Sequence, residues 1–310
     1  MDKLIICCTP YQIFLIDLIV KTYKIGGIHL IYFGKIDKKT KLYFEKIRPN
    51  VEKLNFFEIG EGKRLKEILL FKKFVHETLE EKYHEVWFAN FNALEIKIIN
   101  SICSFDYYVG FDDGLGSINK KSGLYRESDS ILRFLFYYSL GIRINDFHLF
   151  RFVEKYYGVY DKKLYPFKKI YPITYNFDND FHSKGDEILN FFVAQPFDEE
   201  KLDYKKLESF LNKNNVKFFF PHHRQNYFLK SLEVIDTQYL FEDYIIDIIS
   251  SKKYSQIVIY SINSSVLLNC VNFDGVSCIS LKSEKLYSEY KFIYDLMEVS
   301  GIKVVDYVSS

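Results

Sequence analysis

The sequence predicts an α/β fold made of two Rossmann-like halves, each with a parallel sheet, that face each other across a central cleft. Three observations support this prediction. The chain opens with a strand, a tight turn and a helix in "KLIICCTPYQ". Short apolar runs then alternate with helical patterns up to about residue 111. The same alternation resumes at residue 188, beyond a middle segment of different character.

In the first half, the opening strand leads into a helix. Thr9 is its predicted N-cap, and Pro10 takes the first helical position. Apolar runs rich in β-branched and aromatic residues predict strands, whereas helical spacing of apolar residues predicts helices. We expect strands at 28–33, 85–89 and 106–111 and helices at 64–83 and 93–102.

The middle, about 120–185, is aromatic and basic, with helical spacing, little strand character and a turn-rich end that predicts a linker. We therefore expect a first domain over 1–185, with this segment as a helical insertion, and a second domain over 186–310. The segment 131–171 has two interpretations. It is a buried helical pair that completes the first domain, or it docks peripherally on an anionic membrane, which suits its aromatic and basic residues.

The second half predicts another parallel sheet. We expect strands at 188–194, 216–221, 256–261, 275–281 and 303–308 and helices near 199–213, 241–251, 264–270 and 286–299. Ligands bind such sheets beyond the carboxyl ends of the strands. Residues just after a strand are therefore the first candidates for a site.

Composition excludes several classes of protein. The 310 residues carry a net charge of +1, which gives no electrostatic footprint for binding nucleic acid. The stretch 4–20 is interrupted by Thr, Pro, Gln and Asp and lacks a small-residue cleavage site, so it predicts neither a membrane span nor a signal peptide. Five cysteines without a CxxC pair indicate reduced core thiols in a cytoplasmic protein.

In the first half, the candidate residues are two adjacent acids. Asp112 and Asp113 follow the strand at 106–111 in "VGFDDGLGSI", and Gly114 opens the turn. They fit a solvated turn, a metal site or one wall of a catalytic pocket. Because no partner cluster stands at ligand spacing, we predict that they bind no metal.

In the second half, polar clusters follow the predicted strands or open the helices. Their members are Asp198, Glu199, Glu200, His222, His223, Glu242, Asp243, Asn263, Ser264 and Ser265. The acids and hydroxyls fit ordinary helix starts, where they cap the helix or favour its dipole. Beside a cleft, the same hydroxyls and free N–H groups can hold a phosphate. The histidine pair fits a plain loop, a metal site or a phosphate contact, although no HxxxH or Cys partner accompanies it.

The order and spacing of five segments resemble the bacterial sialyltransferases of glycosyltransferase family 52, which include lipooligosaccharide and capsular enzymes. The segments are "CCTPYQ", "FDDGLGSI", "PHHRQNY", "FEDYIIDII" and "IYSINSSVLL". The resemblance covers most of the chain but not the aromatic middle. His223 stands where the family has a proline.

This resemblance implies a GT-B fold and an inverting transfer of sialic acid from CMP-sialic acid to a terminal sugar of a surface glycan, with galactose expected. It implies no cofactor and no metal. Asp198 becomes the first candidate for the base and Glu199 the next, with Asp112 and Asp113 as rivals. His222 would donate to the leaving phosphate. Ser264 and Ser265 would bind that phosphate and Glu242 the ribose, while Asn263, Thr9, Gln12 and Gly114 join the nucleotide-sugar site.

Several alternatives stay open. The donor can be another nucleotide-activated sugar, or the chain can be a non-catalytic glycan-binding protein on the same fold. The sequence does not choose the acceptor, its attachment to lipid, the 2,3 or 2,6 linkage, or between a monomer and a homodimer.

Overall fold

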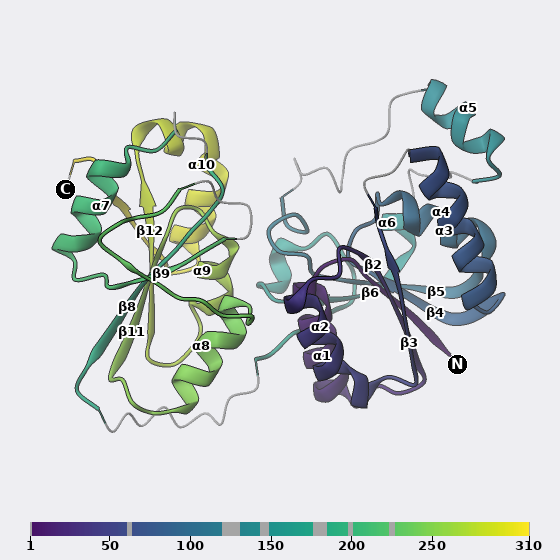
Figure 1. Ribbon diagram of the computed structural model, residues 1–310, viewed down its shortest axis with the longest axis horizontal. Helices are drawn as coiled ribbons and strands as arrows, with labels where there is room; N and C mark the ends of the chain where they lie inside the picture. The colour runs from purple at the N-terminus through teal and green to yellow at the C-terminus, as the bar shows by residue number, and fades with distance from the viewer. Residues whose placement is uncertain are drawn as a thin grey trace. The chain divides into compact units, whose positions relative to one another are not determined.

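Two parallel sheets organise the chain, one in each of two units, Met1–Asn176 and Phe177–Ser310 (Figure 1). We call these unit 1 and unit 2. The computed structural model describes residues 2–60, 64–119, 131–142, 149–175, 185–197, 201–222 and 227–309. The sequence places the domain boundary between 185 and 186, shortly after this division.

Unit 1 is built on a seven-stranded sheet in the order β3-β2-β1-β4-β5-β6-β7. Its strands are β1 Lys3–Cys7, β2 Ile28–Gly34, β3 Lys53–Glu58, β4 Lys82–Phe88, β5 Ser104–Phe111, β6 Val153–Gly158 and β7 Ile170–Pro172. All neighbouring pairs are parallel, so the carboxyl ends of the strands meet at one edge. β1 and β2 are buried almost throughout, as expected for strands covered on both faces.

The helices of unit 1 are α1 Pro10–Tyr23, α2 Lys38–Ile47, α3 Arg64–Thr78, α4 Leu94–Ile102, α5 Ile131–Ser139 and α6 Leu149–Phe152, with 3₁₀ turns η1 Arg48–Asn50 and η2 Lys162–Leu164. The predicted start of α1 is confirmed, because Thr9 Oγ1 accepts a hydrogen bond from the Gln12 N–H at 3.2 Å. The helix predicted over 64–83 is too long, since β4 begins at Lys82 and Tyr83 is buried in it.

The middle segment was predicted to have little strand character, and this prediction is wrong. Val153–Gly158 pairs with β5 as β6, and Ile170–Pro172 forms β7 inside the predicted linker. Successive strand residues point to opposite faces of a sheet. Tyr156 stacks on Phe167 with ring centroids 4.1 Å apart, and Tyr157 stacks on Trp87 at 4.9 Å. The aromatic residues here fill both faces of a sheet, which a helical interpretation of their spacing misses.

The interpretation of 131–171 as a buried helical pair is also wrong for α5. Ile131 is 76 % exposed and Leu132 is 79 % exposed, and most other apolar side chains of this helix are exposed as well. Within the described residues, Tyr137 is the side chain that α5 buries.

Unit 2 has a six-stranded parallel sheet in the order β10-β9-β8-β11-β12-β13. Its elements are β8 Ile188–Val193, α7 Tyr204–Lys213, β9 Phe218–Phe220, β10 Glu233–Val234, α8 Phe241–Ser250, β11 Gln256–Ser261, α9 Ser265–Cys270, β12 Val276–Lys282, α10 Glu284–Val299 and β13 Lys303–Asp306. The expected alternation of strands and helices is confirmed, and only the two-residue β10 has no counterpart in the prediction. A core that includes Phe192, Leu207, Phe219 and Tyr294 packs on this sheet.

Two further expectations concern the whole chain. The five cysteines are free thiols, and all except the half-buried Cys8 lie in the core. Among the residues that the structure describes, no helix combines the length and the apolar character that crossing a bilayer requires.

Candidate active site

Asp112, the first acid of the "DDG" turn, is wholly enclosed behind the end of β5. Its Oδ1 accepts a hydrogen bond from Tyr156 at 2.9 Å and lies 2.5 Å from the Ser117 hydroxyl. Its Oδ2 accepts from the Val159 N–H at 2.5 Å and from the Tyr165 hydroxyl. Burial raises the pKa of Asp112 to about 6, although these hydrogen bonds act in the opposite direction. Asp112 therefore fixes the turn from within and presents no face to a substrate.

Two glycines make room for this network. A Cβ atom on Gly110 would lie 2.5 Å from the ring of Tyr156, and one on Gly158 would lie 2.5 Å from the ring of Tyr165. Only a residue without a side chain lets both rings approach close enough for their hydroxyls to reach Asp112. Gly114, with φ of +79°, then turns the chain so that Ser117 returns to the same carboxylate.

Asp113 differs from its neighbour because it is half-buried. Burial raises its pKa to about 6, the neighbouring Gln12 amide lowers it, and the charge of Asp112 raises it further. A pKa near 6 suits a general base at neutral pH, because the group is then ionised but still able to take a proton. Of the two acids, Asp113 has the setting of a functional group.

Gln12 lies in the first turn of α1, directly beside this acid, and is 1 % exposed. Its Oε1 accepts a hydrogen bond from the Cys8 N–H at 2.6 Å, which fixes the orientation of the amide. Its Nε2 is enclosed beside the Asp113 carboxylate, and the amide N–H lowers the pKa of that acid. Gln12 therefore helps to orient the Asp113 carboxylate. Thr9, the cap of α1, completes this part of the site.

In unit 2, the predicted residues at the end of β11 form the start of α9. Ser264 is 1 % exposed and caps α9 by accepting from the Val266 N–H at 3.2 Å. Gln195, which follows β8, donates its Nε2 to the same hydroxyl at 2.8 Å. Ser265 is half-buried at the first position of the helix. Ser264 thus joins the carboxyl ends of β8 and β11, while Ser265 is the more accessible hydroxyl.

Asn263 precedes this cap in a left-handed conformation, with φ of +39°. Asparagine tolerates this region better than most residues, which explains its place at the strand end. Its Nδ2 is enclosed, and no acceptor for it lies among the residues that the structure describes.

His222 and Glu242 lie at the corresponding edge. His222 is half-buried just after β9, and Glu242 is buried in the first turn of α8, where it accepts from Asn269 Nδ2 at 2.8 Å. Asp198, Glu199, Glu200 and His223 lie outside the described residues. Over the described part of the chain, no three His, Cys, Asp or Glu side chains are grouped so as to hold a metal ion.

Sequence reasoning missed the residues that hold Asp112. Tyr156, Val159 and Tyr165 belong to β6 and the loop after it, which the helical interpretation of the middle segment hid. The available signal was Gly158 in the centre of "KYYGVY", because glycine inside an apolar run marks a close approach of other groups.

The sequence profile of Glycosyltransferase family 52 matches residues 27–285. A "CMP-N-acetylneuraminate:beta-galactoside alpha-2,3-sialyltransferase" of Pasteurella multocida is 28 % identical over 98 % of this chain and 99 % of its own length. An "N-acetyllactosaminide alpha-2,3-sialyltransferase" of Haemophilus influenzae is 27 % identical over 97 % of this chain and 98 % of its own. A protein of the same description from Neisseria meningitidis is 24 % identical over 98 % of this chain and 85 % of its own.

Among solved structures, that of Arabidopsis thaliana UGT89C1 has a TM-score of 0.52 with 10 % identity and covers 98 % of this chain and 84 % of its own. At 10 % sequence identity, the similarity is evidence for the fold alone. Together with the two parallel sheets, it supports the GT-B type of α/β fold that the sequence predicts.

Proposed function

Because the chain belongs to glycosyltransferase family 52 and is a glycosyltransferase, we propose that it transfers sialic acid from CMP-sialic acid to a terminal galactose, forming an α-2,3 linkage. The names of all three relatives support sialyl transfer with an α-2,3 linkage, and the name of the Pasteurella multocida relative supports the CMP-linked donor. The observation that carries the proposal is the pairing of Asp113, with its raised pKa, and the enclosed Gln12 amide at the strand ends of unit 1.

The proposed reaction needs a base on the acceptor side. The acceptor hydroxyl forms a bond to C2 of sialic acid, the bond from C2 to the phosphate oxygen breaks, and the hydroxyl proton passes to a carboxylate. Attack opposite the departing CMP inverts the configuration at C2. Asp113 is supported as this base by its half-buried setting, and Asp198 by its place in the family motif. The role of Asp112 is to position Asp113.

The leaving group carries the developing negative charge. We propose that His222 donates to the phosphate, that Ser265 and the Asn263 amide contact it, and that Glu242 takes the ribose hydroxyls. Hydrogen-bond donors of this kind stabilise the departing phosphate without a metal ion. We therefore propose a metal-independent reaction.

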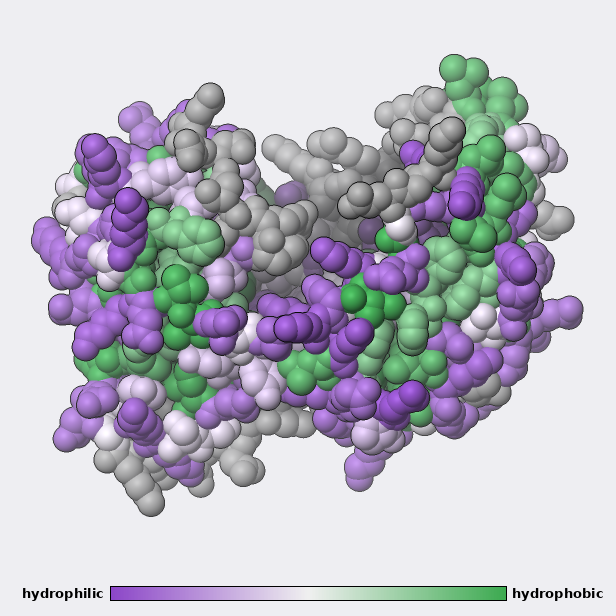
Figure 2. Space-filling model, viewed as in Figure 1, coloured by the Kyte–Doolittle hydropathy of each residue, from purple (hydrophilic) through white to green (hydrophobic). Residues whose placement is uncertain are grey.

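We propose that the acceptor is a surface glycan attached to lipid and that the protein docks peripherally on the inner face of the cytoplasmic membrane. The exposed apolar side chains of α5 support this: Ile131, Leu132, Phe134, Leu135, Phe136 and Tyr138. We call this group the α5 surface. Figure 2 shows apolar atoms gathered where Figure 1 labels α5. Leu65, Leu69 and Leu70 of α3 are also exposed, and Arg64 ties the two helices together by donating to Tyr137 at 2.5 Å.

The proposed function is tested by incubating the protein with CMP-sialic acid and lactose. We expect release of CMP together with a sialyl-lactose whose linkage analysis shows an α-2,3 bond, with EDTA present or absent. UDP-galactose in place of CMP-sialic acid should give no product. If CMP is not released, the donor assignment is wrong. Loss of all turnover in EDTA, restored by magnesium or manganese, would contradict metal independence.

A further inference from the structure

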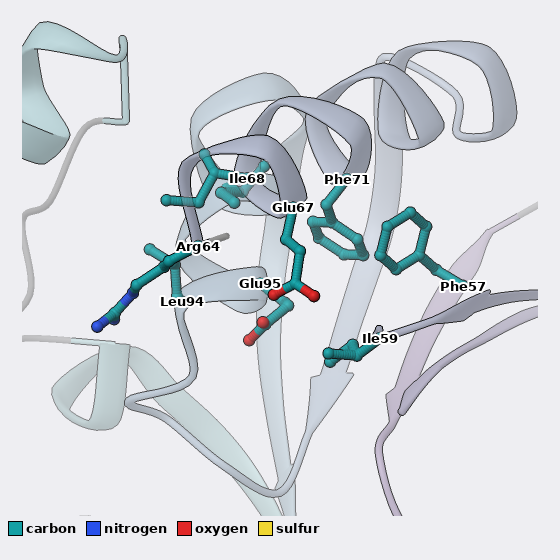
Figure 3. Close-up of a pocket in the computed structure, with 9 residues that line it drawn as sticks. Phe57, Ile59, Arg64, Glu67, Ile68, Phe71, Leu94 and Glu95 are labelled. Carbon is teal, nitrogen blue, oxygen red and sulfur yellow. The ribbon is translucent and has the colours of Figure 1, made fainter. Parts of the chain in front are cut away.

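A cavity of about 450 Å³ in unit 1 has no role in the site described above. It lies beyond the carboxyl end of β3, beside the first turns of α3 and α4 (Figure 3). Six apolar side chains and three charged ones line it: Phe57, Ile59, Ile68, Phe71, Leu94, Ile98, Arg64, Glu67 and Glu95. Its volume lies within the range of small-ligand pockets.

The carboxylates of Glu67 and Glu95 converge in this cavity. They come from different helices, and Figure 3 shows their oxygens turned toward each other while Arg64 extends away. The guanidinium of Arg64 is engaged with the Tyr137 hydroxyl on α5. Helix dipoles favour acids in the first turn of each helix, but they do not require the two carboxylates to meet.

This convergence is electrostatically unfavourable for the isolated protein. Burial raises the pKa of Glu95, and the charge of Glu67 raises it further against the opposing charge of Arg64. Like charges held together in a half-buried cavity are typical of a binding site, because a ligand that donates hydrogen bonds to both relieves the repulsion.

The cavity and the candidate base lie at the same edge of the sheet, because Glu95 is in the first turn of α4, which follows β4, and Asp113 follows β5, the neighbour of β4. Burial raises the pKa of the Cys8 thiol to about 12, and the charges of both Asp113 and Glu95 contribute to this shift. Cys8 follows the end of β1, so one acid of the cavity and Asp113 both lie within electrostatic range of the same strand end. Both acids therefore lie at the edge where parallel sheets of this kind bind their ligands.

The lining has two kinds of surface. Phe57 and Phe71 form an edge-to-face aromatic pair with centroids 5.1 Å apart, and Ile68 and Leu94 add aliphatic surface. The carboxylates of Glu67 and Glu95 accept hydrogen bonds and repel anions. A neutral pyranose matches both, because its C–H face packs on apolar side chains and its hydroxyls donate to carboxylates.

We propose that this cavity binds the neutral sugar that precedes the terminal galactose of the acceptor, with Glu67 and Glu95 accepting hydrogen bonds from its hydroxyls. The proposal rests on the proposed function, in which galactose presents its hydroxyl to the base. It makes the cavity a specificity-determining site that favours a galactosyl disaccharide over a simple galactoside.

The test compares kcat/KM for lactose with kcat/KM for methyl β-galactoside. We expect the wild type to prefer lactose by about 10-fold or more, and Glu95→Gln or Glu67→Gln to reduce that preference by about 10-fold, the size expected for one hydrogen bond to a charged group. Leu94→Trp, which narrows the cavity without removing a charge, should have the same effect. Turnover of methyl β-galactoside should stay within about twofold in all three variants. Glu77→Gln is the matched control, because Glu77 also lies on α3 but is exposed beside Lys73.

Saturation-transfer NMR with lactose provides a readout that does not depend on turnover. Saturation of the glucose ring protons in the wild type, lost in Glu95→Gln, supports the cavity even if no sialic acid is transferred. An equal preference for the two acceptors in the wild type would overturn the proposal. So would an unchanged preference in Glu67→Gln, Glu95→Gln and Leu94→Trp, or glucose protons that receive no saturation.

Discussion

Asp112 and Asp113 are neighbours in the sequence, but their surroundings give them different tasks. Asp112 is enclosed by hydroxyl and N–H donors from β6 and the loop after it, so its carboxylate stabilises the structure of unit 1. Asp113 is half-buried beside the Gln12 amide and has an accessible face. Substitution of each acid should therefore change a different property of the protein.

Asp112→Asn should lower the free energy of unfolding by about 2–3 kcal/mol. The carboxylate now accepts hydrogen bonds from several hydroxyl and N–H donors, and the NH₂ group of the new amide would itself face some of these donors. Urea titration at pH 8 measures this loss. Gly158→Ala should have a similar effect through Tyr165, which the added methyl group would displace from Asp112. A stability within about 0.5 kcal/mol of the wild type for both variants would show that Asp112 is not structural.

Asp113→Asn should lower kcat by ~10²- to 10⁴-fold if Asp113 is the base. In the wild type, kcat/KM should fall tenfold per pH unit below about 6, since only the ionised acid accepts the proton. The same assay on Asp198→Asn compares the two candidate bases. Near-normal turnover in both variants would mean that neither acid is the base.

The pKa of Asp113 also links it to stability. Its folded pKa lies above the ordinary value, so its ionisation destabilises the native state, fully at pH 8 and hardly at all below about pH 3. Asp113→Asn should therefore raise the free energy of unfolding by about 1–2 kcal/mol at pH 8, and this gain should shrink as the pH falls from 6 to 4. A gain of stability with a loss of turnover distinguishes a functional acid from a structural one.

His222→Ala should lower kcat by ~10²- to 10³-fold, because it removes a hydrogen bond that is strongest when the phosphate departs. His84→Ala is the matched control, since His84 lies on the exposed side of β4 beside Asp106. His223→Pro, which restores the usual pair of the family, should be tolerated. If His222→Ala turns over as fast as His84→Ala, His222 is not the donor to the phosphate.

At the scale of elements, α5 is the helix whose apolar side chains are least explained by packing. We expect the wild type to float with vesicles that contain anionic lipid, and Leu132→Ser combined with Leu135→Ser to weaken this binding by about tenfold. Phe292→Ser combined with Val299→Ser is the control, because it removes exposed apolar side chains from α10 of unit 2. If the two double variants float equally, or if the wild type does not float with the vesicles, the α5 surface is not a membrane contact.

Local signals predicted some elements well. The Thr9 cap, Pro10 and the apolar run before them led to β1 and α1, because these interactions lie within a few residues of one another. β6 escaped prediction because its tyrosines are stabilised by partners far along the chain, such as Trp87 and Asp112. For the same reason, the sequence picked out the "DDG" turn as a site but could not assign separate roles to its two acids. The convergence of Glu67 and Glu95 depends on helix packing and left no local signal.

At the scale of the whole molecule, the two units should divide the substrates between them. We expect CMP to slow hydrogen exchange at the end of β9 and around α9, at 218–222 and 261–270, while the backbone of β1 and β5 in unit 1 exchanges at its usual rate. Hydrogen-exchange mass spectrometry of the intact chain, with UMP as a comparison ligand, measures this. Protection confined to residues 1–119 would show that CMP binds unit 1, which would contradict this prediction.

The position of the aromatic middle segment within the sheet of unit 1 has a consequence for engineering. Its first part, within the connection 112–152, joins the adjacent parallel strands β5 and β6, which any chain of this topology must join by a crossover. Because the entropy of closing a loop grows slowly with its length, such a crossover tolerates exchange and extension. Residues 120–148 could therefore be replaced by the corresponding stretch of a relative as a cassette, provided that Ser117 and the tyrosines of β6 still reach Asp112. Chimaeras of this kind would inherit membrane preference from one parent and reaction chemistry from the other.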